Sequence, residues 1–400
     1  MRAKALTERH LRDLCRTHVF VLPETGKGSI QDVLEQAFKG APSFATKRLL
    51  RRGKTVHQPA TVVDSLLQTI VDASIRDQEH VRQSNRHDLI TNLILFLKEP
   101  CRRRIYRFDI KNFYESVDRD LILEDLRREN RIPATSIRIL AGIFSYCQNQ
   151  KVTGLPRGMS LCATLAERHL GPFDDAIRSE KEVFLYLRFV DDILLVTSGL
   201  EKPDHIDRVV TSTLAGLGLT LNRGKTKKCD LRKVSESFDY LGYRFSVSEP
   251  DTEKGALTLK VDIADKKVNR TKTMLIRALI AFNRDGDFAI FRDRVRFLTG
   301  NCIVSRKSAS EALRAGVYYS YPHLSSPNRA DGALARLDAF LKRIVISGRL
   351  GRTVLSKRLL DVDQKTQILK MSFRSGHVNK ICTTFSAARL KTICTIWLHV

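Results

Sequence analysis

Two adjacent aspartates between two apolar runs constrain this chain more than any other feature. Residues 183–190 and 193–196 are rich in strand-forming apolar side chains, and Asp191 and Asp192 stand between them. Strands joined so closely form a tight hairpin, although such turns ordinarily contain Asn-Gly or another glycine pair. Two carboxylates about 4 Å apart repel by about 4 kcal/mol at an effective dielectric constant near 20. The pattern therefore predicts a cation at this turn, most simply a divalent metal ion.

A third acid, Asp109, ends another predicted strand. Residues 105–110 alternate between apolar and polar side chains, and the pattern changes towards a helix that starts near Asp118. A carboxylate at the end of one strand and two more at an adjacent hairpin can share two Mg²⁺ ions about 3.5 to 4 Å apart. We therefore expect the two-metal arrangement of phosphoryl transfer.

Five segments that follow one another along the chain resemble the motifs of reverse transcriptases. In chain order they are Phe108–Ser116 (motif A), Gly154–Gly158 (motif B), Arg188–Asp192 (motif C, with Phe189 in the usual tyrosine position), Leu217–Thr226 (motif D) and Phe238–Gly242 (motif E). One such motif alone is a weak signal, whereas five in the family's order across residues 105 to 245 are a strong one. The resemblance implies an α/β (α+β) fold, a right-hand polymerase with fingers, an RRM-like antiparallel palm and a helical thumb.

The resemblance also implies a division of the chain into four parts. These are residues 1–104 (N-terminal helices and fingers), 105–250 (palm with an interleaved fingers segment), 251–345 (helical thumb) and 346–400 (basic helical C-terminal extension). Apolar spacing and capping residues predict the individual elements. Helices are expected over residues 30–39, 61–76, 88–98, 160–177 and 206–216, and a strand over residues 217–222.

The family's catalytic roles carry over to the acids that match its motifs. Asp109, Asp191 and Asp192 are then the catalytic residues, with Asp192 in a supporting role. The same three carboxylates and the backbone carbonyl of Ile110 are the implied ligands of two Mg²⁺ ions, with Mn²⁺ as the alternative ion. Tyr114 matches the aromatic position that excludes a ribose 2′-hydroxyl and so favours deoxynucleotides.

A basic segment before motif A is expected to hold the triphosphate of the incoming nucleotide. In the polymerase interpretation residues 41–60 form the fingers hairpin, and a solvated basic loop is the alternative. The residues expected at the dNTP are Lys47, Arg51, Lys54, Ile110, Tyr114, Arg157, Gly158 and Lys225. For Lys225 the family places a lysine near the leaving pyrophosphate, and the alternative is again a solvated charge.

Motif B departs from the family pattern at two points. Arg157 stands where glutamine is common, and Cys162-Ala163 stands where Ser-Pro is common. These departures concern the positioning of the templating base and leave the carboxylates intact. In its overall look the chain is similar to prokaryotic reverse transcriptases of the defence-associated branch, the abortive-infection and retron-like enzymes, which implies a role in bacterial antiviral defence.

The charge of the chain favours a nucleic-acid partner independently of any family. Lys and Arg number 69 against 44 Asp and Glu, so the formal net charge is +25. An excess spread along the chain is the electrostatic signature of phosphate binding. We expect an RNA template (a structured non-coding RNA), a DNA product and dNTPs as partners, with a partner protein or an oligomer as a further option. No signal-peptide pattern or bilayer-length apolar run is present in the sequence, which predicts a cytoplasmic protein without membrane contact.

Three other functions stay open at this point. An RNA-dependent RNA polymerase shares the palm chemistry but needs no aromatic gate at Tyr114. A catalytically silent RNA-binding scaffold explains the charge but not three acids in matching motif positions. A two-metal nuclease uses similar carboxylates but does not need motifs B, D and E.

Overall fold

Two compact units make up the chain in the computed structural model. The described residues are 7–18, 20–24, 26, 28–39, 44–51, 53–79, 81, 83–99, 103–202, 204–230, 236–248, 258–306, 312–350, 353–354 and 360–397. The first unit comprises Met1–Leu89 and Cys101–Asp230, and the second comprises Ile90–Pro100 and Leu231–Val400. Each unit has its own cluster of buried apolar side chains. Among the described residues, no helix is both long enough and apolar enough to cross a membrane.

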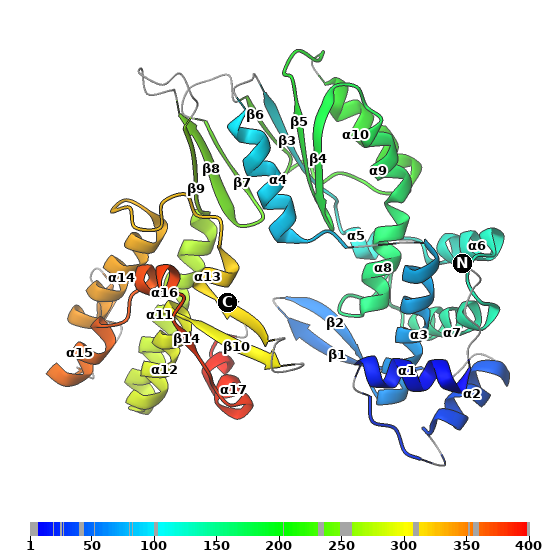
Figure 1. The fold of residues 1–400 in the computed structure, drawn as a ribbon, viewed down its shortest axis with the longest axis horizontal. Coiled ribbons are helices and arrows are strands. Elements are labelled where there is room, and N and C mark those ends of the chain that lie inside the picture. The colour runs from blue at the N-terminus through cyan, green and yellow to red at the C-terminus, as the bar shows by residue number, and fades with distance from the viewer. Residues whose placement is uncertain are drawn as a thin grey trace. The chain divides into compact units, whose positions relative to one another are not determined.

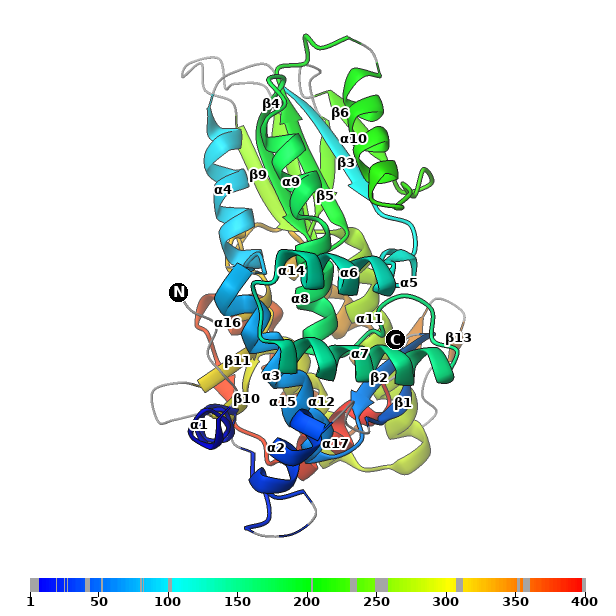
Figure 2. The ribbon, with the colours of Figure 1, turned by 90° about the vertical axis from the view of Figure 1, so that its right-hand side faces the viewer.

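A four-stranded antiparallel sheet forms the centre of the first unit. Its strands are β3 (Arg104–Asp109), β4 (Val183–Phe189), β5 (Asp192–Thr197) and β6 (Lys227–Asp230), in the spatial order β4-β5-β3-β6. Helices α9 (Gly171–Arg178) and α10 (His205–Gly216) lie against one face of this sheet (Figures 1 and 2). This is a β-α-β-β-α-β arrangement with β3 and β5 side by side in the middle. The predicted RRM-like antiparallel palm is confirmed.

Helices and one hairpin complete the first unit. They are α1 (Glu8–His18), α2 (Ile30–Lys39), β1 (Thr46–Arg51), β2 (Lys54–Pro59), α3 (Val62–Glu79), α5 (Phe113–Ser116), α6 (Arg119–Glu129), α7 (Ala134–Asn149) and α8 (Ser160–His169). The predicted start of a helix near Asp118 is confirmed, because its side chain caps α6 by accepting from the N–H groups of Asp120 and Leu121. The antiparallel pairing of β1 with β2 forms the hairpin expected in the basic segment.

Two element predictions in the first unit were wrong. The helix expected over residues 160–177 is two helices, α8 and α9, because Pro172 at the start of α9 has no N–H and cannot continue α8. The strand expected over residues 217–222 reduces to a single bridge between Ile110 and Leu221. There the chain turns through Gly218 at a φ of +70°, so an extended strand cannot begin at Leu217.

The second unit combines strands and helices. Its elements are the greater part of α4 (Arg86–Lys98), which begins in the first unit, and β7 (Ser237–Tyr240), β8 (Tyr243–Ser248), β9 (Thr258–Ile263), α11 (Asp265–Asp285), α12 (Phe288–Thr299), β10 (Asn301–Arg306), β11 (Ala312–Gly316), α13 (Val317–Ser320), α14 (Ala333–Ser347), β12 (Arg349–Leu350), β13 (Thr353–Val354), α15 (Val362–Leu369), α16 (Phe373–Val378), β14 (Cys382–Thr383) and α17 (Ala387–Thr395). Helix α4 lies beside the β7-β8-β9 sheet (Figures 1 and 2).

The hairpin at the segment that resembles motif E is explained by its own two turn residues. Leu241 and Gly242 join β7 to β8 with positive φ at both positions, +45° and +86°. Such a pair defines a two-residue type I′ hairpin, and its second position is where glycine is preferred. The region after this hairpin was expected to be mostly helical, and the structure adds β9 and the β11-β10-β14 sheet to the helices.

A buried ion cluster holds β4 against α8 and α9. Arg188 on β4 is 7% exposed and lies 2.6 Å from an oxygen of Asp174 and 2.8 Å from one of Glu167. Its Nη1 also donates to the carbonyl of Val190, in the turn that follows β4. Burial lowers the pKa of Arg188, but the hydrogen bonds and charge of Asp174 outweigh it and raise the pKa. The guanidinium therefore stays charged and stabilises the turn through its hydrogen bond to Val190.

Removal of this guanidinium should destabilise the first unit strongly. In Arg188→Ala, Asp174 and Glu167 stay buried without the cation that lies between them, so we expect a loss of about 3–5 kcal/mol in the free energy of unfolding. Urea unfolding followed by circular dichroism measures it. The matched control is Arg178→Ala, because Arg178 is 60% exposed and lies 4.0 Å from the same Asp174, farther than Arg188 does. There we expect a loss of at most about 1 kcal/mol in the free energy of unfolding. Equal midpoints for the two variants would contradict this role of Arg188.

Candidate active site

The hairpin turn between β4 and β5 contains only two residues, Val190 and Asp191. Phe189 pairs directly with Asp192, so Asp192 is already the first residue of β5 rather than part of the tip. Val190 has a φ of +60°, which is a true outlier for a β-branched side chain. The unfavourable turn predicted from the sequence is confirmed. Strained backbone of this kind is found where function requires a particular side-chain placement.

Asp109 reaches the same edge of the sheet from β3. It lies opposite Asp192 in the register, and the N–H of Ile110 donates to the carbonyl of Asp191 at 3.3 Å. The carboxylate of Asp109 accepts from Lys225 Nζ, which lies 3.0 Å from each oxygen, and from Asn222 Nδ2 at 3.2 Å. Lys225, expected near a triphosphate, pairs with Asp109 in this structure.

Asp191 carries negative charge that its surroundings do not fully balance. Burial, followed by the charges of Asp109 and Asp192, raises the pKa of Asp191, and a backbone hydrogen bond and the charge of Arg157 offset only part of this. An added cation stabilises the ionised form of a carboxyl group whose pKa is raised in this way. The observation supports the expectation that a cation belongs at this turn.

Asp192 has a different environment from Asp191. Its two oxygens accept from Nε and Nη2 of Arg107, both at 2.8 Å. The sequence analysis missed Arg107, although a usable signal existed: Arg107 precedes Asp109 by two residues and therefore lies on the same face of β3. Asp192 is already paired with a cation, which fits the supporting role expected for it.

The residues at the turn fit a divalent ion whose coordination shell is completed by substrate. Among the described residues, no group of three or more His, Cys, Asp or Glu side chains is placed to hold a metal. Mg²⁺ sites of phosphoryl-transfer enzymes use one or two carboxylates plus substrate phosphates rather than a complete protein cage. Asp109 and Asp191 provide that pair. Within the described part of the chain the carbonyl of Ile110 accepts no backbone hydrogen bond, so it is available as a further oxygen ligand.

Tyr114 lies on α5, directly after the strand that carries Asp109. Its ring packs edge-on against Phe113, and burial raises its pKa to about 12, so the hydroxyl stays protonated at neutral pH. Arg157 places its guanidinium carbon 5.0 Å from the centre of the Tyr114 ring and forms an ion pair with Glu115 at 2.8 Å. The structure thus brings the predicted Tyr114 and Arg157 together, and it adds Glu115, which the sequence analysis missed.

The glycines of motif B approach protein backbone. A Cβ on Gly154 would lie 2.2 Å from the carbonyl oxygen of Tyr114, and one on Gly158 would lie 2.8 Å from that of His57. Both glycines have positive φ, at +57° and +97°. The structure places the backbone of α5 beside Gly154 and that of β2 beside Gly158. Larger side chains are excluded because the turn is pressed between these two elements.

The fingers hairpin presents its basic residues to the outside. Lys47, Arg51 and Lys54 are all exposed. Of the three, Lys54 lines a cavity of about 430 Å³ bounded by the hairpin, α5 and the motif B turn, which Arg157 lines as well. Lys47 and Arg51 are not among its lining residues. The cavity therefore supports Lys54 more than the other two as a residue that meets a phosphate.

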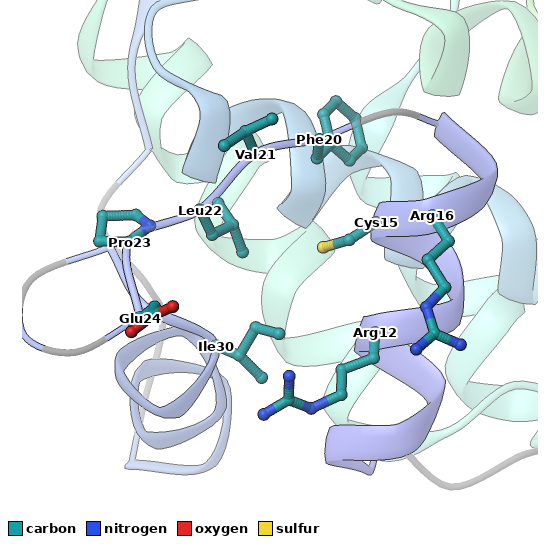
Figure 3. Close-up of a pocket in the computed structure, with 9 residues that line it drawn as sticks. All are labelled: Arg12, Cys15, Arg16, Phe20, Val21, Leu22, Pro23, Glu24 and Ile30. Carbon is teal, nitrogen blue, oxygen red and sulfur yellow. The ribbon is translucent and has the colours of Figure 1, made fainter.

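A second cavity of the first unit lies away from all these residues. It has a volume of about 620 Å³ and is formed by α1, α2 and the segment between them. Arg12 and Arg16 project from α1 at one side, opposite Leu22 and Pro23 (Figure 3). None of the residues expected at a catalytic or nucleotide site lines it.

Neutralising Asp191 should stabilise the metal-free protein. A raised pKa in the folded state means that the protonated form is favoured on folding, so this stabilisation is complete at low pH and lost as the pH rises through the folded pKa. At neutral pH without divalent ions, Asp191→Asn should therefore raise the melting temperature, with a difference that shrinks towards about pH 4. Differential scanning fluorimetry measures both.

Asp192→Asn is the control for this experiment. It leaves Arg107 without its carboxylate, so we expect a lower melting temperature at neutral pH. A destabilised Asp191→Asn protein at every pH would contradict the charge imbalance inferred for the turn.

Comparison with known proteins finds a family model that matches part of this chain. Residues 59–245 match the family model described as reverse transcriptase (RNA-dependent DNA polymerase). A comparison with curated proteins finds no match. Among solved structures, apo telomerase from Candida tropicalis truncated from its C-terminal domain is 15% identical, with a TM-score of 0.36, over 56% of this chain and 55% of that one.

Two further telomerase structures are similar to the same degree. Telomerase from Candida albicans in complex with a TWJ fragment of telomeric RNA is 13% identical, with a TM-score of 0.37, over 90% of this chain and 62% of that one. Full apo telomerase from Candida tropicalis is 13% identical, with a TM-score of 0.37, over 97% and 68%. The chain thus spans less than two thirds of the first two. The match to the reverse transcriptase family model is confined to residues 59–245, a little under half of the chain.

Proposed function

We propose that the protein is an RNA-directed DNA polymerase that adds dNTPs to a primer end on an RNA template with the help of two Mg²⁺ ions. One observation carries this proposal: β3 and the strained β4–β5 turn bring Asp109 and Asp191 to one edge of the palm sheet with an uncompensated negative charge. The reverse transcriptase match over residues 59–245 supports it. Reverse transcriptases use divalent metal ions; the identity and number of the ions are part of the proposal.

Each side chain at the turn has a definite task in this chemistry. Asp109 and Asp191, with the carbonyl of Ile110, would hold the ions. Bound there, divalent ions would lower the pKa of the primer 3′-hydroxyl and stabilise the negative charge of the leaving pyrophosphate. Arg107 keeps Asp192 oriented and neutralised beside them. Lys225, which pairs with Asp109 here and is 63% exposed, would be the cation available to the leaving pyrophosphate.

Sugar selectivity is proposed to reside at Tyr114. The ring is anchored by Phe113 and Arg157 and belongs to the short helix that follows Asp109. The ring also packs, partly buried, against the apolar core of the first unit. Lys54 and the cavity it lines are proposed to meet the triphosphate, while Lys47 and Arg51 are placed to attract it electrostatically.

The biological setting is proposed from the motif resemblance and the charge. A net charge of +25 favours a long RNA partner, for which we propose a structured non-coding RNA as template. The likeness of the motifs to the defence-associated prokaryotic branch supports a cytoplasmic enzyme of antiviral defence. Its neighbours in the genome and its phage phenotype would test that setting.

An extension assay tests the enzymatic proposal. The protein is purified with its bound nucleic acid and given Mg²⁺ with each labelled dNTP or rNTP in turn, and the RNA and DNA that result are sequenced. We expect DNA product from the wild type and none above background from Asp191→Asn, because one of the two ion-binding carboxylates is lost. The control is Asp175→Asn, which removes an aspartate that is 82% exposed and should leave synthesis intact.

Each other result favours a different function. Incorporation of rNTPs as efficient as that of dNTPs would replace the proposal by an RNA-dependent RNA polymerase. Cleavage without extension would indicate a nuclease. RNA binding without any product would indicate a scaffold.

A further inference from the structure

Arg157 makes two contacts with consecutive residues of α5. Its Nε and Nη2 donate to the two oxygens of Glu115 at 2.8 and 2.9 Å, and its guanidinium carbon lies 5.0 Å from the centre of the Tyr114 ring. The bidentate pair fixes the plane of the guanidinium, since both N–H groups on one edge are engaged. The same guanidinium therefore rests on the ring in one defined orientation.

The backbone around Arg157 is anchored on both sides. The carbonyl of Arg157 accepts from the N–H of His57 on β2 at 2.7 Å, and the N–H of Leu155 donates to the carbonyl of Tyr114 at 2.7 Å. The close approach of Gly154 to α5 and of Gly158 to β2 leaves no room for the turn to shift. The side chain of Arg157 thus starts from a fixed point between the fingers hairpin and the helix that carries Tyr114.

The contact is also linked to the proposed catalytic residues along the chain. Tyr114 and Glu115 belong to α5, which begins at Phe113, shortly after β3 ends at Asp109. Arg157 is 21% exposed at its side chain, so its interaction with the ring is only partly screened by water. A cation over an aromatic face in such a setting is worth more than at a fully exposed site.

We propose that Arg157 is a positioning residue that, together with Glu115, fixes the ring of Tyr114 and so determines how strongly the enzyme rejects ribonucleotides. This inference rests on the proposed polymerase function and on Tyr114 as its steric gate. A gate works only if its ring cannot tilt, because a shift of about 1 Å is enough to alter reaction geometry. The arginine supplies this rigidity where the family commonly has glutamine, which carries no charge to place over the ring.

A direct phosphate contact is the competing role for Arg157, and it has a different kinetic signature. A guanidinium that binds the triphosphate contributes equally for dNTPs and rNTPs, so its loss lowers kcat/KM for both. A guanidinium that holds the gate changes their ratio. The engagement of two of its N–H groups by Glu115 favours the second role.

A double-mutant cycle with Tyr114 tests the proposal. Values of kcat/KM for one dNTP and the matching rNTP are measured for the wild type, Arg157→Gln, Glu115→Gln, Tyr114→Ala and Arg157→Gln/Tyr114→Ala. We expect each of Arg157→Gln and Glu115→Gln to lower the dNTP:rNTP ratio roughly tenfold. In the Tyr114→Ala background, Arg157→Gln should not change the ratio further, because the ring on which it acts is gone. Arg157→Lys should keep only part of the selectivity, since lysine cannot form the bidentate pair.

The outcomes separate this inference from the function on which it rests. Absence of synthesis by the wild type would overturn the polymerase function itself. Normal synthesis with an unchanged ratio in Arg157→Gln and Glu115→Gln would overturn the positioning role alone. An equal fall in kcat/KM for both nucleotides, or a further loss of selectivity in the double variant, would also overturn it. Melting temperatures of all variants identify any that fail to fold, and Glu115→Gln then carries the test because it alters only the partner carboxylate.

Discussion

Repulsion between the carboxylates of Asp109 and Asp191 is the interaction on which the rest of the site depends. The fold brings these groups together without a complete set of counter-charges. Lys225 and Asn222 donate to Asp109, and Arg107 pairs with Asp192. The pKa of Asp191 stays raised. Binding of a cation relieves such a charge imbalance. The arrangement suits divalent ions that arrive with a nucleotide, since substrate phosphates complete their coordination.

Neighbouring elements hold the strained turn that presents Asp191 in place. The turn that presents Asp191 includes Val190 in a left-handed conformation, and its carbonyl is held by Arg188. Arg188 is in turn held by Asp174 and Glu167 from the helices behind the sheet. The strain at the turn is thus opposed by a buried ionic cluster, and a buried charge of this kind is strongly destabilising when its partners are lost.

The strands that carry the carboxylates could be predicted because their signals are local, whereas the palm topology was expected from the resemblance of the motifs to reverse transcriptases. Strand alternation around Asp109 and the two apolar runs around Asp191 require no knowledge of distant residues. The pairing of Glu115 with Arg157 spans 42 residues and depends on the turn geometry of Gly154 and Gly158, so no local pattern revealed it. The break between α8 and α9 had a local signal in Gly171-Pro172 that helical periodicity outweighed. Sites of the second unit, whose basic residues carry no motif, stayed undetermined.

Metal binding in the presence of nucleotide tests the central claim most directly. Free Mn²⁺ is followed by electron paramagnetic resonance while it is titrated into the wild-type protein and Asp191→Asn, with and without a dNTP and a primer that cannot be extended. The account predicts that the dNTP tightens Mn²⁺ binding to the wild type and that Asp191→Asn loses this tightening. Equal Mn²⁺ binding by the two proteins in the presence of the dNTP would contradict the assignment of Asp109 and Asp191 as the ion-binding pair.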